Sequence, residues 1–341
     1  MKLAGLESSG KVVIIFPVQF RKSRLFSFCL ILSLSSPFFG CSKSSDSDTS
    51  SSADEKPTIA LVMKSLANEF FKTMGEGAEQ HHASQSDQYD LIVNGIKNET
   101  DVSAQVDMVE QMMSRGVDAI VIAPADSKAL IPILNRAHDA GVLIINIDNK
   151  LDADILAELN LNVPFVGPDN REGARMVGEV VGKTLSRGDP VAIIEGVTTA
   201  FNGIQRRLGF EDAMKEAGMK VVSTQSGSWE MAKANTIAAA ILNEHKDIKA
   251  LLCANDSMAL GAVAAVRAAG LEGKVLVAGF DNISAVQPMI ASRQMIATAD
   301  QHGDQLAVFG IEAALSILSG AEQPEDKKTA VDLITAASLG Q

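Results

Sequence analysis

The apolar run Thr58-Ile59-Ala60-Leu61-Val62-Met63 is followed at once by Lys64-Ser65-Leu66-Ala67-Asn68-Glu69-Phe70-Phe71, which leads into a helical pattern. A short apolar run that gives way to polar residues before a helix is typical of a strand in a parallel α/β sheet. Such sheets bind ligands in a crevice at the carboxyl ends of their strands. The octet that begins at Lys64 offers polar groups and aromatic rings together, which suits the hydroxyls and the C–H faces of a sugar.

The same alternation of short apolar runs and amphipathic stretches continues along the chain. It predicts further strands at residues 90–93, 119–123, 143–147, 190–195, 220–225, 250–254 and 275–279. Strands that alternate with helices, and are apolar throughout, indicate parallel sheets covered by helices on both faces. Segments 296–300 and 305–318 have no partner strands of their own in this pattern, so we expect them to cross back between two lobes.

The N-terminal end of the chain has the layout of a secretory leader. Basic residues around Arg24 precede the apolar run 25–32, which is too short to span a bilayer comfortably. We predict that residues 1–41 are a signal peptide and that the Ser-rich residues 42–56 form a flexible tether. The protein is therefore expected in the periplasm.

Cys41 lies between this leader and the tether, and it resembles the acylation site of bacterial lipoproteins, with the small Gly40 before it. Phe38 and Phe39 depart from that pattern. We expect a lipid anchor at Cys41 that holds the protein at the membrane, and the alternative is plain cleavage nearby.

Composition limits the classes of partner. The chain has 46% hydrophobic residues and a formal net charge of -12, which argues against nucleic acid. Cys29 leaves with the leader and Cys41 is the acylation candidate, so Cys253 has no disulfide partner in one mature chain. A buried, inert thiol is the ordinary state of such a residue.

The sequence contains no complete motif for catalysis or for cofactor binding. The stretch Gly178 to Thr184 resembles a phosphate loop but is one residue short and sits within a helical pattern, so it indicates small residues on a helix packed against a sheet. The histidines lack the spacing of metal ligands, and no Gly-Xaa-Ser-Xaa-Gly elbow occurs. We predict no enzyme activity, no cofactor and no metal.

Polar residues recur where predicted strands end: Asp148-Asn149, Asn255-Asp256 and Asp281-Asn282. Each of these residue types alone also favours helix N-caps and turns, so capping stays open as the alternative. Their joint placement at carboxyl edges favours ligand binding. Trp229, the only tryptophan, follows Ser226-Gly227-Ser228, and its ring is either a stacking platform or part of the core.

Together these residues resemble the periplasmic sugar-binding proteins of ribose and allose importers, from about Lys56 to the C-terminus. The resemblance rests on 66–71, 123–127, Asp148, Asp169-Asn170, 206–210, 254–261, 279–281 and 297–301. It implies two similar Rossmann-like lobes with parallel sheets and a hinge of three crossings, the type I periplasmic binding protein fold. The lobes expected are 57–164 plus 302–329 and 165–301 plus 330–341, with crossings near 163–166, 299–303 and 329–331.

The resemblance also implies which residues contact a sugar. Those implied to contact hydroxyls are Asn68, Asp148, Arg206, Asn255, Asp281 and Gln301, and those implied to stack on the ring are Phe70, Phe71 and Trp229. Lys64 replaces a serine of the ribose branch, and Asn149 replaces an arginine. Both favour the allose branch, in which Lys64 reaches a hydroxyl or braces a carboxylate. The alternative for Lys64 is an ordinary solvated lysine.

The sequence therefore predicts a monomeric, non-catalytic receptor that closes on a monosaccharide and delivers it to the permease of an ABC importer. A receptor for a polyol or another sugar, serving chemotaxis or sensing, is the nearest alternative. The effector domain of a lac-repressor-type regulator shares the fold but needs a DNA-binding head where this chain has a leader. A sugar-modifying enzyme is the third class, and it would turn its sugar over.

Overall fold

The computed structural model describes residues 56–340. The predicted leader, Cys41 and the tether up to residue 55 lie outside this part of the chain. Within it, no helix has the length and apolar character needed to cross a membrane.

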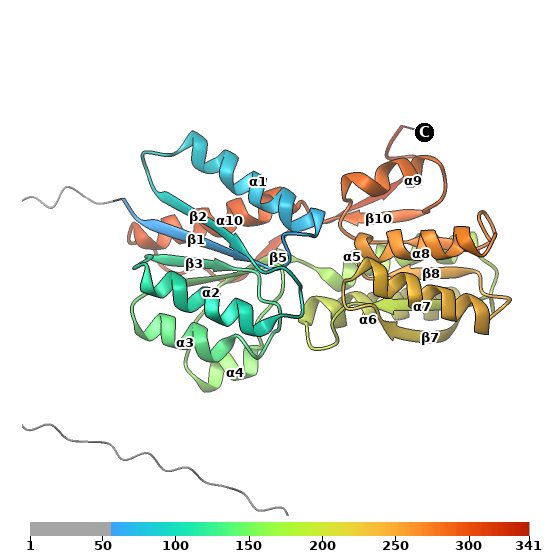
Figure 1. Ribbon diagram of the computed structural model, residues 1–341, viewed down its shortest axis with the longest axis horizontal. Helices are drawn as coiled ribbons and strands as arrows, with labels where there is room; N and C mark the ends of the chain where they lie inside the picture. Colours follow the sequence, from blue (N-terminus) through green and yellow to red (C-terminus); the bar gives the residue numbers. More distant parts are fainter. Residues whose placement is uncertain (1–55, 341) are drawn as a thin grey trace, which may run out of the picture. The chain divides into compact units, whose positions relative to one another are not determined.

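The first sheet has the strand order β11-β5-β4-β3-β1-β2, and all of its pairs are parallel (Figure 1). Its strands are β1 (Thr58–Met63), β2 (Asp90–Gly95), β3 (Ala119–Ile122), β4 (Leu143–Ile147), β5 (Phe165–Pro168) and β11 (Lys327–Thr329). Helices α1 (Glu69–Ser84) and α10 (Gly303–Leu318) cover one face, and α2 (Val102–Ser114) and α3 (Ile131–Asp139) cover the other. Helix α4 (Ala153–Glu158) follows β4.

Side chains of β1 alternate between the two cores of this lobe. Ile59, Leu61 and Met63 pack under α1 and α10, whereas Ala60 and Val62 pack on the α2 and α3 side. Because successive side chains of a strand point to opposite faces, a wholly apolar strand must be covered on both. Full burial of each large side chain contributes about 1.5–3 kcal/mol.

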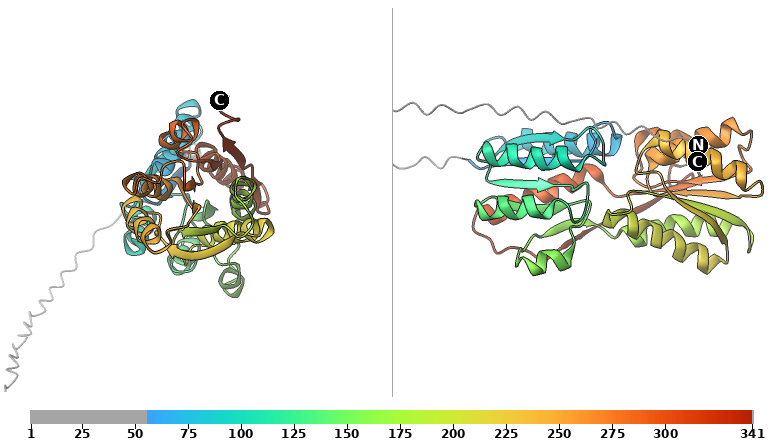
Figure 2. Two further views of the ribbon diagram at one scale, coloured as in Figure 1. Left: turned by 90° about the vertical axis from the view of Figure 1, so that its right-hand side faces the viewer. Right: turned by 60° about the horizontal axis from the view of Figure 1, so that its bottom comes forward.

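The second sheet has the order β12-β10-β9-β8-β6-β7, in which β12 alone runs antiparallel, against β10. Its strands are β6 (Pro190–Glu195), β7 (Lys220–Ser226), β8 (Ala250–Cys253), β9 (Leu276–Ala278), β10 (Ala297–Asp300) and β12 (Asp332–Thr335). Helices α5 (Asn170–Thr184) and α6 (Phe201–Ala217) pack together, as do α7 (Met231–Glu244) and α8 (Asp256–Ala268) (Figure 2). The short η1 (Ser284–Val286) and α9 (Gln287–Ala291) follow β9.

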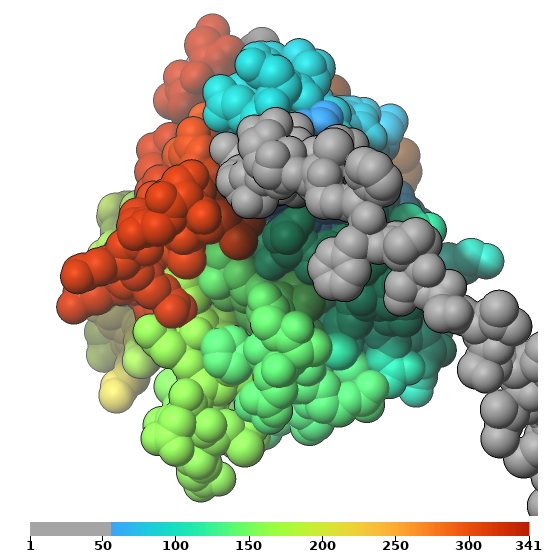
Figure 3. Space-filling view, turned by 90° about the vertical axis from the view of Figure 1, so that its left-hand side faces the viewer, coloured from blue at the N-terminus to red at the C-terminus, as the bar shows by residue number. Residues whose placement is uncertain are grey.

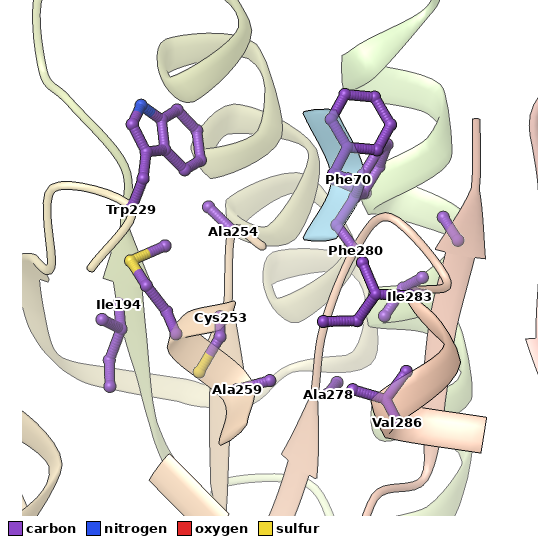
Figure 4. Packing of buried hydrophobic residues seen from close by; sticks show 14 of the residues in the cluster. Phe70, Ile194, Trp229, Cys253, Ala254, Ala259, Ala278, Phe280, Ile283 and Val286 are labelled. Atoms are coloured by element: carbon purple, nitrogen blue, oxygen red, sulfur yellow. The ribbon is translucent and has the colours of Figure 1, made fainter. Parts of the chain in front are cut away.

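Two expectations about this lobe can be compared with the structure. Gly178 lies inside α5 as expected, but it packs on another helix rather than on the sheet, because an added Cβ would come 2.6 Å from Cβ of Ala213 on α6. Cys253 is fully buried in β8 among Ile194 and Ala259 (Figure 4). Burial raises the pKa of its thiol far above the ordinary value, which keeps it unreactive.

The chain passes between the sheets three times: from β5 to α5, from β10 to α10 and from β11 to β12. The expected first crossing at 163–166 and the boundary after residue 164 are wrong, because Phe165–Pro168 forms β5, which pairs with β4 and β11 in the first sheet. The expectation that residues 296–300 lack a partner strand is also wrong, since β10 pairs with β9 and β12.

Helix α10 returns to the first lobe, as expected for a crossing segment. It packs against α1 and β4, which are remote from it in sequence. In Figure 3 the orange-red surface of this late segment lies beside the green surface of the residues around α3 and α4. The first lobe is thus built from two separate parts of the chain.

Candidate functional site

The carboxyl ends of both sheets meet at one pocket. Its empty volume, which counts all space not filled by atoms, is about 210 Å³. The residues that line it follow strand ends of both lobes or begin the next helices: Lys64, Asn68, Phe70, Phe71, Glu99, Asp148, Asn202, Arg206, Trp229, Asn255, Asp281 and Gln301. Sequence analysis named all of these except Glu99 and Asn202.

Lys64 is buried at the end of β1, with a side chain only 2% exposed. Its Nζ lies 2.8 Å from Asp148 Oδ2 and 3.9 Å from Glu99 Oε2. The rings of Phe71 and Trp229 have their centroids 5.3 and 5.9 Å from the same nitrogen, within the range of cation–π attraction. The solvated alternative for Lys64 is excluded, and the expected bracing of a carboxylate is what the structure shows.

Asn68 has several hydrogen-bonding roles at the start of α1. Its Oδ1 accepts from the backbone N–H of Phe70 at 3.1 Å, which caps the helix, and its Nδ2 donates to Glu99 Oε1 at 2.8 Å. Asn255 likewise caps α8, where its Oδ1 accepts from Met258 N at 2.9 Å. The capping alternative is therefore correct for Asn255, and Asn68 caps its helix as well. Both side chains also line the pocket.

Arg206, on the first turns of α6, holds the second-lobe side of the pocket together. It donates from Nε to Asn170 Oδ1 at 2.7 Å, and from Nη1 to Ala254 O at 2.9 Å and to Asp281 Oδ1 at 3.2 Å. Gln301 Nε2 also donates to Asp281 Oδ1, at 2.7 Å. Charge-assisted bonds of this kind are strong in a buried site and fix the positions of both partners.

The aromatic rings come from both lobes. Phe70 and Phe71 meet edge to face, with centroids 5.1 Å apart, at the start of α1. Trp229 lies across the pocket in the turn before α7 and is 4% exposed (Figure 4). Its ring fits over Gly196, where an added Cβ would come 2.1 Å from the indole, so a glycine is required there.

Three pocket residues have positive φ angles although they are not glycine: Asp148 (60°), Trp229 (67°) and Asp281 (120°). Such conformations are sparsely populated for L-residues and cost on the order of 1–3 kcal/mol each. In the first two cases the backbone turns sharply after a strand, which aims the side chain into the pocket. Strain of this kind is concentrated where proteins bind ligands.

Three buried polar atoms that line this pocket have no hydrogen-bond partner within the described residues: Asp148 Oδ2, Trp229 Nε1 and Gln301 Oε1. Asp148 Oδ2 contacts the Lys64 ammonium, but the angle is not that of a hydrogen bond. Because buried polar atoms are nearly always satisfied, the pocket is matched to a ligand that supplies both donors and acceptors. A hydroxyl group both donates and accepts hydrogen bonds.

The two lobes contact each other around the pocket. The hydrogen bonds that join them include Ser257 Oγ to Asn68 Oδ1 at 3.3 Å, Ser284 N to Glu69 Oε1 at 2.8 Å, Phe201 N to Ser127 Oγ at 2.9 Å and Asn202 N to Asn149 Oδ1 at 3.1 Å. This is the closed arrangement of the lobes, in which a ligand would be held on all sides.

Asn149 is not among the residues that line the pocket, contrary to its sequence assignment. Its Nδ2 donates to Pro124 O at 2.9 Å, while its Oδ1 accepts from Ser127 Oγ and from Asn202 N. The Asn149 amide thus forms hydrogen bonds at the contact between the lobes. Asp148, next to it, turns into the pocket instead.

Glu99 and Asn202 were missed because neither directly follows a strand. Glu99 lies in the loop between β2 and α2, and Asn202 lies in the first turn of α6. The spacing of strands and helices brings them to the carboxyl edges only in the folded structure. Within residues 56–340, no group of three His, Cys, Asp or Glu side chains is placed to hold a metal.

Burial raises the pKa of Glu99 to about 7, although Lys64 and the hydrogen bond from Asn68 oppose this shift. Burial also raises the pKa values of Asp256 and Asp281. These three pKa values are higher in the folded protein than in the unfolded chain, where they are near 4. The stability that the three acids contribute is therefore fully present below about pH 4 and is lost as the pH rises through their folded-state pKa values.

The unliganded protein is therefore expected to become less stable between about pH 5 and pH 8, by up to about 1.4 kcal/mol per pH unit for each acid. Thermal unfolding over a pH series would measure this. The Glu99→Gln variant should show a shallower dependence, which separates the buried acid from the general self-repulsion of an acidic chain. A melting temperature that is constant or rises over this range would contradict the prediction.

A family match and a similar relative indicate the same class of protein. Residues 59–322 match the family described as periplasmic binding protein domain. The D-ribose/D-allose-binding protein of Pseudomonas aeruginosa is 58% identical over 83% of this chain and 90% of its own length.

Two solved structures are similar in fold. An ABC transporter solute-binding protein from Burkholderia multivorans, with an unknown ligand, superposes with a TM-score of 0.81 at 58% identity, over 82% of this chain and 100% of the other. A periplasmic solute-binding protein from Actinobacillus succinogenes, with bound D-allose, has a TM-score of 0.78 at 36% identity, over 83% and 98%.

Proposed function

Because this chain belongs to the periplasmic binding protein family, we propose that it is the substrate-binding component of an ABC-type importer for a ribose- or allose-like monosaccharide. The observation that carries the proposal is the closed pocket between the lobes, in which aromatic rings, charged groups and unpartnered polar atoms surround a space of about 210 Å³. This is the chemistry that a neutral, hydroxyl-rich ring requires.

Each side of the pocket has a role in this proposal. Phe70, Phe71 and Trp229 pack on the C–H faces of the sugar ring. Asp148, Asp281 and Gln301 accept hydrogen bonds from hydroxyls, and Lys64, Arg206, Asn68 and Asn255 complete the polar set. Because carboxylates and cations are already paired with each other, the sugar adds hydrogen bonds to a network that is fixed before it binds.

Capture works by a shift between open and closed lobes. A sugar that contacts both lobes makes its full set of bonds only in the closed state, so its binding favours closure. The three crossings between β5 and α5, β10 and α10, and β11 and β12 are the segments about which the lobes rotate. The permease then distinguishes the closed, loaded receptor by the spacing of its lobes.

The leader supports a place in the periplasm, and the proposal includes a lipid anchor at Cys41. An acylated receptor stays in the membrane fraction of an osmotic lysate, and Cys41→Ala should release it to the soluble fraction. If the wild-type protein and the Cys41→Ala variant are released equally, the leader is cleaved without acylation of Cys41.

A thermal-shift screen with purified protein from residue 56 onward tests the ligand class. We expect D-allose or D-ribose to raise the melting temperature, because a ligand at a hundred times its Kd stabilises the folded state by about 2.7 kcal/mol. The panel should also contain polyols such as myo-inositol. If neither monosaccharides nor polyols shift the transition, the receptor proposal fails.

The same incubation separates the receptor from a sugar-modifying enzyme. The sugar recovered after release from the protein should be chemically unchanged and stoichiometric. Conversion of a molar excess of sugar would show turnover and favour the enzyme.

A further inference from the structure

Glu99 is the one charged pocket residue that the sequence pattern did not find, and its two oxygens serve different partners. Oε1 accepts from Asn68 Nδ2 at 2.8 Å, and Oε2 lies 3.9 Å from Lys64 Nζ. Its side chain is 5% exposed, and it lies in the loop after β2 rather than at a strand end. A buried carboxylate so placed can orient both neighbours at once.

The orientation of the Asn68 amide follows from these contacts. Its oxygen is occupied by the backbone N–H of Phe70 at 3.1 Å and by Ser257 Oγ at 3.3 Å. Its nitrogen must therefore point to Glu99, and the second N–H of the same nitrogen remains for other acceptors. Glu99 supplies the acceptor on the nitrogen side, so it reinforces the amide orientation that the two contacts of the oxygen set.

The position of the Lys64 ammonium follows in the same way. Asp148 at 2.8 Å and Glu99 at 3.9 Å attract it from two directions, and the rings of Phe71 and Trp229 lie within 6 Å. The ammonium already lies on Asp148 Oδ2, so Glu99 is a second and more distant counter-ion. A flexible lysine that is attracted by two carboxylates is more restricted in position than one attracted by Asp148 alone.

Resting on the proposed function, we propose that Glu99 is a positioning residue for specificity. It sets Lys64 and Asn68 so that both present N–H donors to the same part of a monosaccharide, beside the Asp148 carboxylate. The ligand class that fits is a sugar with adjacent hydroxyls at this end, one accepting from the cation and the next donating to Asp148. Glu99 acts through Lys64 rather than by its own contact with the sugar.

A double-mutant cycle on the full receptor tests this role. Glu99→Gln keeps an acceptor for Asn68 but removes the charge opposite Lys64, and Lys64→Met removes the ammonium. D-allose and D-ribose affinities are measured by calorimetry at about pH 8.5, where Glu99 is ionised because its pKa is about 7. We expect E99Q to weaken binding about tenfold in the wild-type background and less than about threefold in the Lys64→Met background.

An optical signal separates positioning from general damage. Trp229 is the chain's only tryptophan, and the Lys64 ammonium lies 5.9 Å from its ring. Moving the cation should change the emission of unliganded E99Q, and the same substitution should leave the emission of the Lys64→Met variant unchanged. Glu110→Gln, which removes a surface carboxylate paired with Arg136, is the matched control and should alter neither property.

Equal losses from E99Q in the two backgrounds would overturn the proposal, because they would place Glu99 in direct contact with the sugar. No loss in the wild-type background would overturn it as well. E99Q should fold, since burial already favours the neutral acid, and Glu99→Asp, which retracts the carboxylate, repeats the cycle if it does not. Absence of sugar binding by the wild-type protein would instead count against the proposed function.

Discussion

Replacing Arg206 with methionine is expected to abolish sugar binding and to lower the free energy of unfolding by about 3–5 kcal/mol, the usual cost of breaking a buried ion pair. The guanidinium is 3% exposed and serves Asn170, Ala254 O and Asp281 at once. Without it these acceptors lose their donor, and Asp281 loses the cation that counteracts its burial. Chemical denaturation and calorimetry would measure the two losses.

The neighbouring arginine provides a matched control for this substitution. Arg207 pairs with Glu195 and Glu211, and its side chain is 27% exposed, so Arg207→Met should cost less than about 1 kcal/mol and leave binding intact. Arg206→Lys keeps the charge but cannot reproduce the fork of donors, so it should fold better than Arg206→Met and still bind poorly. Wild-type affinity in Arg206→Met would contradict the assignment.

Gly196→Ala should remove sugar binding while the protein stays folded. The new methyl group would lie 2.1 Å from Trp229 Cη2, a distance at which one of them must move. Because the ring lines the pocket, its displacement changes the space that the sugar needs. Overpacking of this kind costs about 1–3 kcal/mol, which a domain of this size tolerates. Tryptophan emission and a sugar titration report the two effects directly.

Another glycine provides the control for that substitution. Gly75 lies within α1, where an added Cβ would meet the flexible end of Met63 at 3.2 Å. Gly75→Ala should therefore be nearly neutral, with unchanged sugar affinity and unchanged Trp229 emission. If Gly196→Ala also binds sugar normally, the indole does not form the wall of the sugar site.

Local pattern was enough to locate the main strands and the elements that follow them. The apolar runs at Thr58–Met63, Leu143–Ile147 and Pro190–Glu195 coincide with β1, β4 and β6. These strands are covered on both faces, so burial imposes an apolar composition that can be read without the structure. The same reasoning placed Lys64, Asp148, Asn255 and Asp281 where strands end, and all of them line the pocket.

The strands missed from the sequence are those next to the crossings. Strands β5, β11 and β12 have only three or four residues each, and β11 and β12 are partly exposed, so they lack a continuous apolar run. Their pairing depends on segments far away in the chain, as when Lys327 lies opposite Val166. Pairing between segments this far apart in the chain closes a long loop and leaves no pattern in the local sequence.

The sequence by itself determined the two-lobed α/β fold and the edge at which ligands bind, because burial and strand ends leave a periodic record in the chain. Other pocket residues, such as Arg206 and Gln301, were predicted only from the resemblance to sugar-binding proteins. The tertiary structure alone decided how these residues are shared between roles. It turned Lys64 inward between two carboxylates, assigned Asn149 to the contact between the lobes and brought Glu99 to the pocket from a loop. Those outcomes depend on distances between side chains remote in sequence, which only folding sets.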